Sequence, residues 1–426
     1  KPCSYKEAQG CKEWEEAMKQ ELDALEKNDT WEVVPYPEKK AIGNKWVEEV
    51  DYIDRFSPVA KAVTIRIFLA LASSYSWPVH QVDINNAFLY GFLDEDIYTY
   101  MQAPTGYSVP KERVCKLKRS LYGLKQASRQ WNLELTSKLL AFSFCQSAHD
   151  HCSFIKHNEA GMMALLVYVN DVLITCTSES KTTEVKDFLH FAFTIKDLGH
   201  ANYFLGLEIE RSSSGTSITQ HKFIRDIICD TGLQSARPAT SPLPPGVKLS
   251  THNSTLLSDT ELYCRLVGRL LYLSFTRPDI SFGAQQLSQF VHAPCTVHMD
   301  VALHLVRYLK GCPERGFFFP ASNSLSLTAY CDTDWTSYTD SRRSLTEYRS
   351  LGSTVCELQW ISLLLADLQV HVPTPIFLFC DNEAAIHIVA NLIFHERTKH
   401  LEIDCHLVPD KFKVGFVLPL HISGTD

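Results

Sequence analysis

Apolar residues along this chain recur with two spacings, and each spacing predicts a different kind of secondary structure. Patterns typical of helices occur at residues 13–31, 63–74, 131–142, 181–193, 259–276, 298–311 and 346–368. Short apolar runs typical of strands occur at residues 81–88, 162–169, 172–177, 203–209, 325–331 and 375–380. Helices and strands mixed in this order indicate an α+β fold.

A proline-rich segment separates two parts of this pattern. Residues 237–246 read RPATSPLPPG, which continues neither a helix nor a strand because proline has a fixed φ and no amide hydrogen. With 426 residues, the chain is long enough for two or three domains that each have a core. We therefore expect a first part at 1–233, a linker at 234–257, a helical part at 258–320 and a last unit at 321–426.

The overall charge limits what the chain can bind through electrostatics alone. Hydrophobic residues make up 45% of the chain, charged residues make up 21%, and the net charge of −8 argues against wholesale coating of nucleic acid. A local basic groove is compatible with this charge, because the stretch 111–129 contains many basic residues and a single acid, Glu112. Its basic residues are Lys111, Arg113, Lys116, Lys118, Arg119, Lys125 and Arg129. The stretch forms either a binding groove or a solvated face.

Cysteine usage and the absence of long apolar runs bear on the compartment. The fourteen cysteines form no CxxC pair and no regular framework, which favours free thiols in a reducing environment. The N-terminus lacks the apolar core of a signal peptide, and the longest apolar runs are far shorter than the ~20 residues that span a bilayer. We expect an intracellular protein, cytoplasmic or nuclear, without membrane association.

The first candidate site lies between the apolar runs 162–169 and 172–177. The residues YVND at 168–171 fall at the tip of the predicted β-hairpin. A carboxylate at such a tip, Asp171, beside a second one from another strand, Asp83, can build a two-metal site for phosphoryl transfer. The same pattern is also typical of a tight turn in which Asn170 adopts a positive φ. Both interpretations are open at this point.

A second candidate site involves carboxylates of the last unit. Asp332 and Asp381 each follow a predicted strand, and Glu347 begins a predicted helix. Carboxylate oxygens gathered in this way are suitable ligands for a divalent cation.

Several longer strings point to a known family. The chain has DINNAFLYG at 83–91, SLYGLKQASRQW at 120–131 and YVND at 168–171, together with FSPVAK at 56–61 and TRPDI at 276–280. In this order, and over essentially the whole chain, they closely resemble the reverse transcriptase of copia-type LTR retrotransposons. The resemblance implies a palm-and-fingers polymerase fold with connecting helices, followed by a ribonuclease H-like α/β domain.

The resemblance also implies roles for individual residues. Asp83 and Asp171 match metal-binding aspartates of the palm, and Phe88 matches the aromatic side chain that excludes a ribose 2′-hydroxyl. Residues Gly123, Lys125 and Gln126 match a segment that contacts template and nucleotide, which favours the basic stretch with Lys118 and Arg119 as a groove. The implied cofactor is Mg²⁺ or Mn²⁺, and the implied partners are an RNA or DNA template-primer and deoxynucleoside triphosphates. Asp332, Glu347 and Asp381 match ribonuclease H carboxylates.

Three departures from the family pattern predict weak activity or none. The family has an acid where this chain has Asn170, and a neutral amide cannot offset the charge of two cations. Only residues 48–55 occupy the space of two basic finger strands, and residues 333–345 are too polar for the central ribonuclease H hairpin. The alternative function is a non-catalytic nucleic-acid-binding or interaction remnant of a polyprotein.

Overall fold

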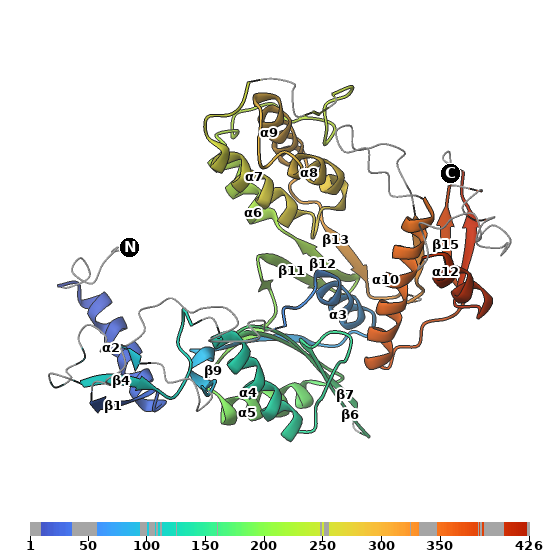
Figure 1. Cartoon of the computed structure of the whole chain (residues 1–426). Helices are drawn as coiled ribbons and strands as arrows, with labels where there is room; N and C mark the ends of the chain where they lie inside the picture. The colour runs from blue at the N-terminus through green and yellow to red at the C-terminus, as the bar shows by residue number, and fades with distance from the viewer. Residues whose placement is uncertain are drawn as a thin grey trace. The chain divides into compact units, whose positions relative to one another are not determined.

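The chain forms two compact units in a computed structural model (Figure 1). The first unit comprises Lys1–Ile65 and Pro78–His200, and the second comprises Arg66–Trp77 and Ala201–Asp426. The structure describes residues 10–35, 58–93, 100–101, 107, 110, 113–124, 126–159, 161–247, 249–250, 255–323, 325–331, 347–381, 383, 386 and 404–423. Each unit is described below by itself.

A six-stranded antiparallel sheet is the centre of the first unit, with the strand order β5-β6-β7-β8-β2-β9. Its strands are β2 (Val79–Ile84), β5 (Cys145–Gln146), β6 (Ser153–Asn158), β7 (Gly161–Tyr168), β8 (Asp171–Cys176) and β9 (Ile195–His200). Strands β7 and β8 are rich in valine, leucine and isoleucine, whose side chains suit a buried pleated surface. The hairpin predicted around 168–171 is therefore confirmed.

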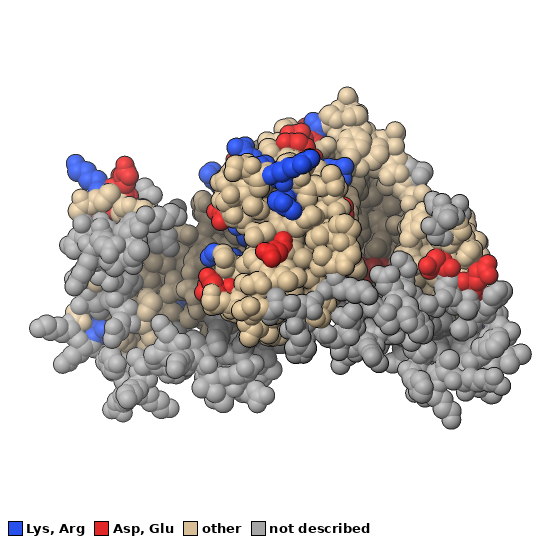
Figure 2. Space-filling model, turned by 90° about the horizontal axis from the view of Figure 1, so that it is seen from above, with Lys and Arg blue, Asp and Glu red and all other residues tan. Residues whose placement is uncertain are grey.

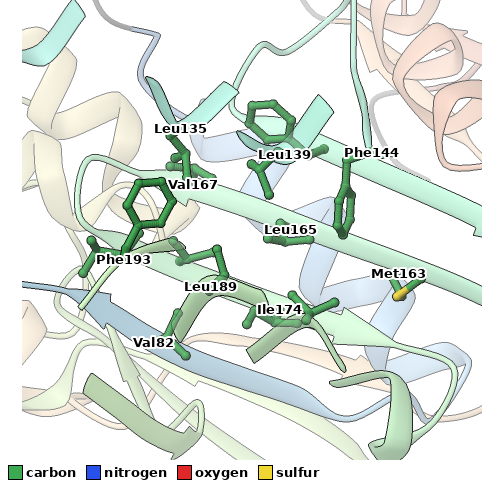
Figure 3. Packing of buried hydrophobic residues seen from close by; sticks show 14 of the residues in the cluster. Val82, Leu135, Leu139, Phe144, Met163, Leu165, Val167, Ile174, Leu189 and Phe193 are labelled. Carbon is green, nitrogen blue, oxygen red and sulfur yellow. The ribbon is translucent and has the colours of Figure 1, made fainter. Parts of the chain in front are cut away.

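Two helices, α4 (Ala127–Ala141) and α5 (Glu179–Ala192), pack against one face of this sheet. Figure 3 shows side chains of this core, among them Val82 of β2, Leu135 of α4, Ile174 of β8 and Leu189 of α5. Each such buried aliphatic side chain contributes about 1.5–3 kcal/mol by leaving water. Because side chains alternate along a strand, the residues next to Val82 in β2 point to the opposite face.

A smaller layer completes the first unit. Strands β1 (Trp31–Pro35), β3 (Tyr100–Met101) and β4 (Arg113–Leu117) form an antiparallel sheet in the order β1-β4-β3. Its core contains Leu25 from helix α2 (Lys12–Lys27) and Leu89 from the short helix η1 (Ala87–Tyr90). The predicted helix 13–31 ends earlier than expected, because Asp29 adopts a φ of 49° and the chain then enters β1.

The second unit contains a four-stranded antiparallel sheet in the order β10-β11-β12-β13, followed by a helical bundle. The strands are β10 (Tyr203–Phe204), β11 (Leu207–Ser212), β12 (Gly215–Thr219) and β13 (Phe317–Pro320). The helices are α6 (His221–Asp230), α7 (Thr260–Leu273), η2 (Pro278–Ile280), α8 (Ser281–Ser288) and α9 (Thr296–Gly311). Helix α3 (Ala62–Ser74) runs from the first unit into the second.

The prediction of one strand at 203–209 is wrong. The chain turns at Leu205 and Gly206, which have φ angles of 50° and 76°, and so forms the two strands β10 and β11. The hydrophobic pattern did not reveal this turn because its first residue is a leucine. The helices predicted at 259–276 and 298–311 are confirmed as α7 and α9.

The C-terminal part of the second unit has a parallel sheet of β14 (Thr328–Cys331), β15 (Ile376–Cys380) and β16 (Val417–His421). Parallel neighbours need crossover connections, and α10 (Glu347–Asp367) and α12 (Asp404–Lys413) lie in the intervening segments. The predicted strand at 375–380 and helix at 346–368 are thus confirmed, whereas the strand predicted at 325–331 begins only at Thr328. In the described part of the chain no helix is long and apolar enough to cross a membrane.

The proline-rich segment packs on the helical bundle in its described portion. Ala239 and Leu243 contact the bundle core, and the amide of Ala239 donates to the carbonyl of Arg307. Nζ of Lys310 donates to the carbonyls of Leu233, Gln234 and Ala236 at 3.2, 2.5 and 2.7 Å. The segment is therefore ordered by specific contacts, while the domain division at 234–257 stays a prediction.

Candidate nucleotidyl-transfer site

Two carboxylates face each other where β2 ends and β8 begins. The antiparallel register pairs Asp83 with Asp171, so their side chains project on the same face of the sheet. This is the face opposite α4 and α5, because Val82 and Ile84 on either side of Asp83 belong to the helix-covered core. The structure thus brings together the two aspartates that the sequence predicted, although they are far apart in the chain.

The turn that carries Asp171 is held by two hydrogen bonds. The indole Nε1 of Trp131 donates to the carbonyl of Val169 at 2.7 Å, and the amide of Ile84 donates to the carbonyl of Asn170 at 2.9 Å. Val169 has a φ of 56°, a conformation that is strained for a β-branched residue. The positive φ expected for Asn170 falls on Val169 instead, because the surrounding contacts override the local preference of each residue.

Each aspartate accepts a hydrogen bond from an amide side chain. Nδ2 of Asn170 donates to Oδ1 of Asp83 at 2.5 Å, and Nε2 of Gln81 donates to Oδ1 of Asp171 at 3.1 Å. Burial raises the pKa of Asp171, the bond from Gln81 lowers it, and the nearby charge of Asp83 raises it, with a net upward shift. A nearby cation would therefore stabilise the ionised carboxylate of Asp171.

The donor set partly fits a divalent metal ion. Asp83 and Asp171 supply the hard carboxylate oxygens that Mg²⁺ and Mn²⁺ prefer. The third position is Asn170, whose amide donates a hydrogen to Asp83 where a carboxylate would share a cation with it. The residues present fit one divalent ion better than two.

A basic residue that the sequence did not single out lies in the same row. The register of β2 with β9 pairs Asp83 with Lys196, so Asp171, Asp83 and Lys196 occupy three adjacent strands on one face. Lys196 is exposed. Only strand pairing reveals this neighbour, since Lys196 belongs to none of the sites predicted from the sequence.

Phe88 is placed by a closely packed 3-10 helix. Helix η1 follows Asn86, which has a φ of 50°, and the ring of Phe88 contacts that of Tyr122 with 4.7 Å between centroids. A Cβ at Gly91 would lie 2.8 Å from the backbone of Gln130, so η1 and α4 are in direct contact here. Phe88 therefore has a fixed position after the strand that carries Asp83.

The segment predicted to contact template and nucleotide is partly described. Gly123 is exposed with a φ of 95°, and Gln126 is buried. Neither amide atom of Gln126 has a hydrogen-bond partner within the described residues. Lys125 lies outside the described residues.

Lys118 and Arg119, both predicted for the basic groove, have partners within the first unit. Nζ of Lys118 lies 3.0 Å from Oδ2 of Asp29 and 3.7 Å from Oε2 of Glu32. The bond to Asp29 in particular raises the pKa of Lys118. Arg119 donates to the carbonyls of Leu89 and Tyr90 at 3.4 and 3.3 Å. Both side chains thus support the local fold.

Surface charge on the face drawn in Figure 2 is mixed. Lysine and arginine side chains lie singly or in small groups beside aspartate and glutamate. The described part of this face therefore carries no continuous basic stripe.

The predicted ribonuclease H carboxylates are only partly described. Asp381 follows β15 and is exposed, and Glu347 begins α10. Asp332 and the segment 333–345 lie outside the described residues, as does the segment 48–55 of the predicted finger deletion. The register pairs Cys331 with Cys380, the residues that precede the two aspartates in sequence.

Comparisons with known proteins give consistent results. A family model described as "Reverse transcriptase (RNA-dependent DNA polymerase)" matches residues 47–245. The retrovirus-related Pol polyproteins from transposons RE1 and RE2 of Arabidopsis thaliana are 36% and 35% identical over 97% of this chain, which covers 32% of each. The chain thus spans about a third of their length. A putative transposon Ty5-1 protein of Saccharomyces cerevisiae is 31% identical over 59% of this chain and 82% of its own length.

Solved structures also align with the chain. A foamy viral protease-reverse transcriptase in complex with dsDNA matches with a TM-score of 0.49 and 12% sequence identity, over 96% of this chain and 83% of that one. This likeness adds nothing to the sequence matches.

Proposed function

This chain belongs to the copia-type retrotransposon Pol polyprotein family, and from that premise we propose that it is a reverse transcriptase segment with an impaired polymerase site. The reaction of the lineage would be attack of a primer 3′-hydroxyl on a deoxynucleoside triphosphate, directed by an RNA or DNA template. Asp83 and Asp171 would hold Mg²⁺ or Mn²⁺, which would supply positive charge to the phosphate in transfer. Residues 1–233 would form this polymerase part.

The hydrogen bond between Asn170 and Asp83 is the observation that carries the impairment. Three carboxylates at such a site repel one another and so favour a bound cation. Here Asn170 adds no charge, and its amide stabilises the carboxylate of Asp83 by donating a hydrogen bond to it. The carboxylates of the metal-free site therefore repel one another less. The free energy gained by binding a second cation is smaller for this reason.

The missing finger strands are a second, independent part of the proposal. In the family these basic strands hold the incoming triphosphate, and residues 48–55 contain four acids in their place. A triphosphate would then be held mainly from the palm, where Lys196 lies beside Asp83. Phe88 would still favour deoxynucleotides, because its ring is fixed by Tyr122 and η1.

We extend the proposal to the C-terminal part as a ribonuclease H-like segment that lacks its central hairpin. Residues 321–426 would hold Asp332, Glu347 and Asp381 as its surviving carboxylates, after the segment 234–257 and the helical part 258–320. The parallel strands β14, β15 and β16 and the helices α10 and α12 in the segments between them support this proposal.

Primer extension on an RNA template tests the proposal directly. The purified chain is assayed with Mg²⁺ and with Mn²⁺ beside its Asp83→Ala variant. We expect product no greater than that of the variant. Template-dependent synthesis that Asp83→Ala abolishes would show that the polymerase site is intact in practice.

The hydrogen bond between Asn170 and Asp83 also favours the second candidate function, a nucleic-acid-binding remnant without catalysis. Binding of an RNA–DNA hybrid by the full chain should then weaken with salt and with Lys196→Glu, since exposed cations near phosphates set affinity. Lys138→Glu on α4 is the matched control, because Lys138 is exposed and pairs with Glu134 in its own helix. Equal affinity in all three proteins would exclude binding through this face.

A further inference from the structure

A cluster of metal-ligand types lies on the other face of β2 from the two aspartates. His80 is three residues before Asp83, and its register partner across β9 is His200. The alternation of side chains places His80 with Val82 on the face covered by α5. Glu179, in the first turn of α5, reaches the same place. Strand β2 therefore meets two elements, α5 and β9, that lie about a hundred residues later in the chain.

The three side chains are close enough to share one cation. One ligand atom from each of His80, Glu179 and His200 lies within 4.8 Å of the other two. Nε2 of His80 is 3.0 Å from Oε2 of Glu179, and the two imidazole rings are 4.3 Å apart between centroids. His80 is buried, whereas Glu179 and His200 are exposed, so an ion can enter from solvent and still be held by a fixed side chain.

One neighbouring group opposes a cation at this place. Nζ of Lys186 is 2.8 Å from Nδ1 of His80 and 2.8 Å from Oδ1 of Asp197. The ammonium already has a carboxylate partner in Asp197, so it can give up its contact with His80 without losing its charge partner. Its positive charge nevertheless weakens metal binding, and its removal should strengthen that binding.

The donor set selects the kind of metal. Two imidazole nitrogens and one carboxylate are a common set for Zn²⁺, which adds water as a fourth ligand. Mg²⁺ prefers oxygen ligands throughout and is therefore expected at the aspartates and not here.

We propose that His80, Glu179 and His200 form a zinc site that joins β2, β9 and the start of α5. A metal bound here ties the edge strand β9 and α5 to the strand that carries Asp83. The site lies on the opposite face from Asp83 and Asp171, and it does not depend on polymerase activity.

Equilibrium titration of the full chain with Zn²⁺, in competition with a chromophoric chelator, tests the proposal. Because the many thiols of this chain can also bind zinc, the measured quantity is the difference in zinc binding between the unaltered chain and each variant. We expect His200→Ala and Glu179→Gln to weaken one site by at least about tenfold. His190→Ala is the matched control, because His190 lies on α5 together with Glu179, and it should leave the zinc affinity unchanged. Lys186→Met should bind the same ion more tightly.

Two further measurements separate a metal site from a structural ion pair. Co²⁺ in the unaltered chain should give nitrogen–oxygen ligand-field bands that His200→Ala removes. Zn²⁺ should raise the melting temperature of the unaltered chain and not that of His200→Ala, whose metal-free melting should remain normal. Identical zinc titrations for the unaltered chain and His200→Ala, or weaker binding by Lys186→Met, would overturn the proposal.

Discussion

Asn170 illustrates how one side chain changes the demands of a site. Its amide donates to Asp83 in the position where the family has a third acid. An aspartate there would place a negative charge against Asp83 and would need a cation to relieve the repulsion. Under the proposal, the asparagine stabilises the tip of the hairpin without metal and lowers the affinity of the site for metal.

Asn170→Asp is therefore expected to raise Mn²⁺ affinity and to lower stability in the absence of metal. The added charge should strengthen Mn²⁺ binding by about tenfold or more, as one well-placed charge typically contributes over 1 kcal/mol. Manganese electron paramagnetic resonance measures the affinity, and urea unfolding with a chelator measures the stability. Polymerisation should not return under the proposal that this chain lacks the basic finger strands. Recovery of primer extension by this one change would show that the chain polymerises without the finger strands.

Arg277 is a residue whose role is structural. Its guanidinium is 1% exposed, donates to both carboxylate oxygens of Asp279 at 2.9 and 2.7 Å, and donates to the carbonyl of Cys312 at 2.9 Å. Tyr308 donates to the same carboxylate at 2.8 Å. Two residues of the TRPDI string, Arg277 and Asp279, thus form a hydrogen-bonded cluster with Tyr308 and Cys312 inside the helical bundle.

Arg277→Met should destabilise the second unit by roughly 3 kcal/mol, because it leaves the partly buried carboxylate of Asp279 without its cation. Urea unfolding followed by tryptophan fluorescence and circular dichroism gives the free energy. Arg269→Met is the matched control, since Arg269 is less buried than Arg277 and pairs with the exposed Asp230, a contact that contributes about 1 kcal/mol or less. Equal losses for the two variants would contradict the role of burial.

At the scale of elements, the hairpin β7–β8 shows how packing stabilises an unfavourable conformation. Val169 has a positive φ at the tip, and the bond from Trp131 of α4 compensates for the strain. Trp131 is fully buried among the rings of Tyr90 and Phe193. Helix α4 therefore determines where Asp171 is presented.

Trp131→Phe keeps most of the ring packing but removes the indole donor. We expect a loss of about 1–2 kcal/mol in stability and faster hydrogen exchange at the hairpin tip. Tyr90→Phe is the control, because it removes the hydroxyl that accepts a hydrogen bond from the amide of Thr194 and leaves the bond to the carbonyl of Val169 in place. Unchanged exchange at residues 168–171 in Trp131→Phe would show that the tip is held by other contacts.

At the scale of the whole molecule, the chain is organised as two units that divide after His200 and within α3. The proline-rich segment lies inside the second unit and is fastened to α9 through Lys310. A composition-based boundary therefore need not mark a flexible connection.

Lys310→Met should release the start of this segment and destabilise the bundle by about 1.5–3 kcal/mol, since the ammonium donates to three carbonyls. Limited proteolysis should then cleave within 234–247 faster, while fragments of the first unit keep their normal rate of appearance. Lys222→Met, at the start of α6, is the comparison. Cleavage at the same rate in both variants would mean that the segment is held mainly by Ala239 and Leu243.

The sequence by itself indicated the longer helices, the β7–β8 hairpin, the family, and Asp83 and Asp171 as candidate site residues, because apolar periodicity and long motifs are local properties. It did not reveal the turn at Leu205, the strained Val169 or the interrupted helix at Asp29. At Leu205 and Val169, contacts from Tyr272 and Trp131 outweigh the preference of the residue itself.

Only the tertiary structure decided which distant residues meet. Strand register placed Asp171 and Lys196 on either side of Asp83, and it placed His80 beside His200 on the opposite face. It also showed that Asn170 bonds to Asp83 and that Lys118 and Arg119 bond within their own unit. Such pairings depend on the order and register of strands, which the free energy of the whole sheet selects and no single segment encodes.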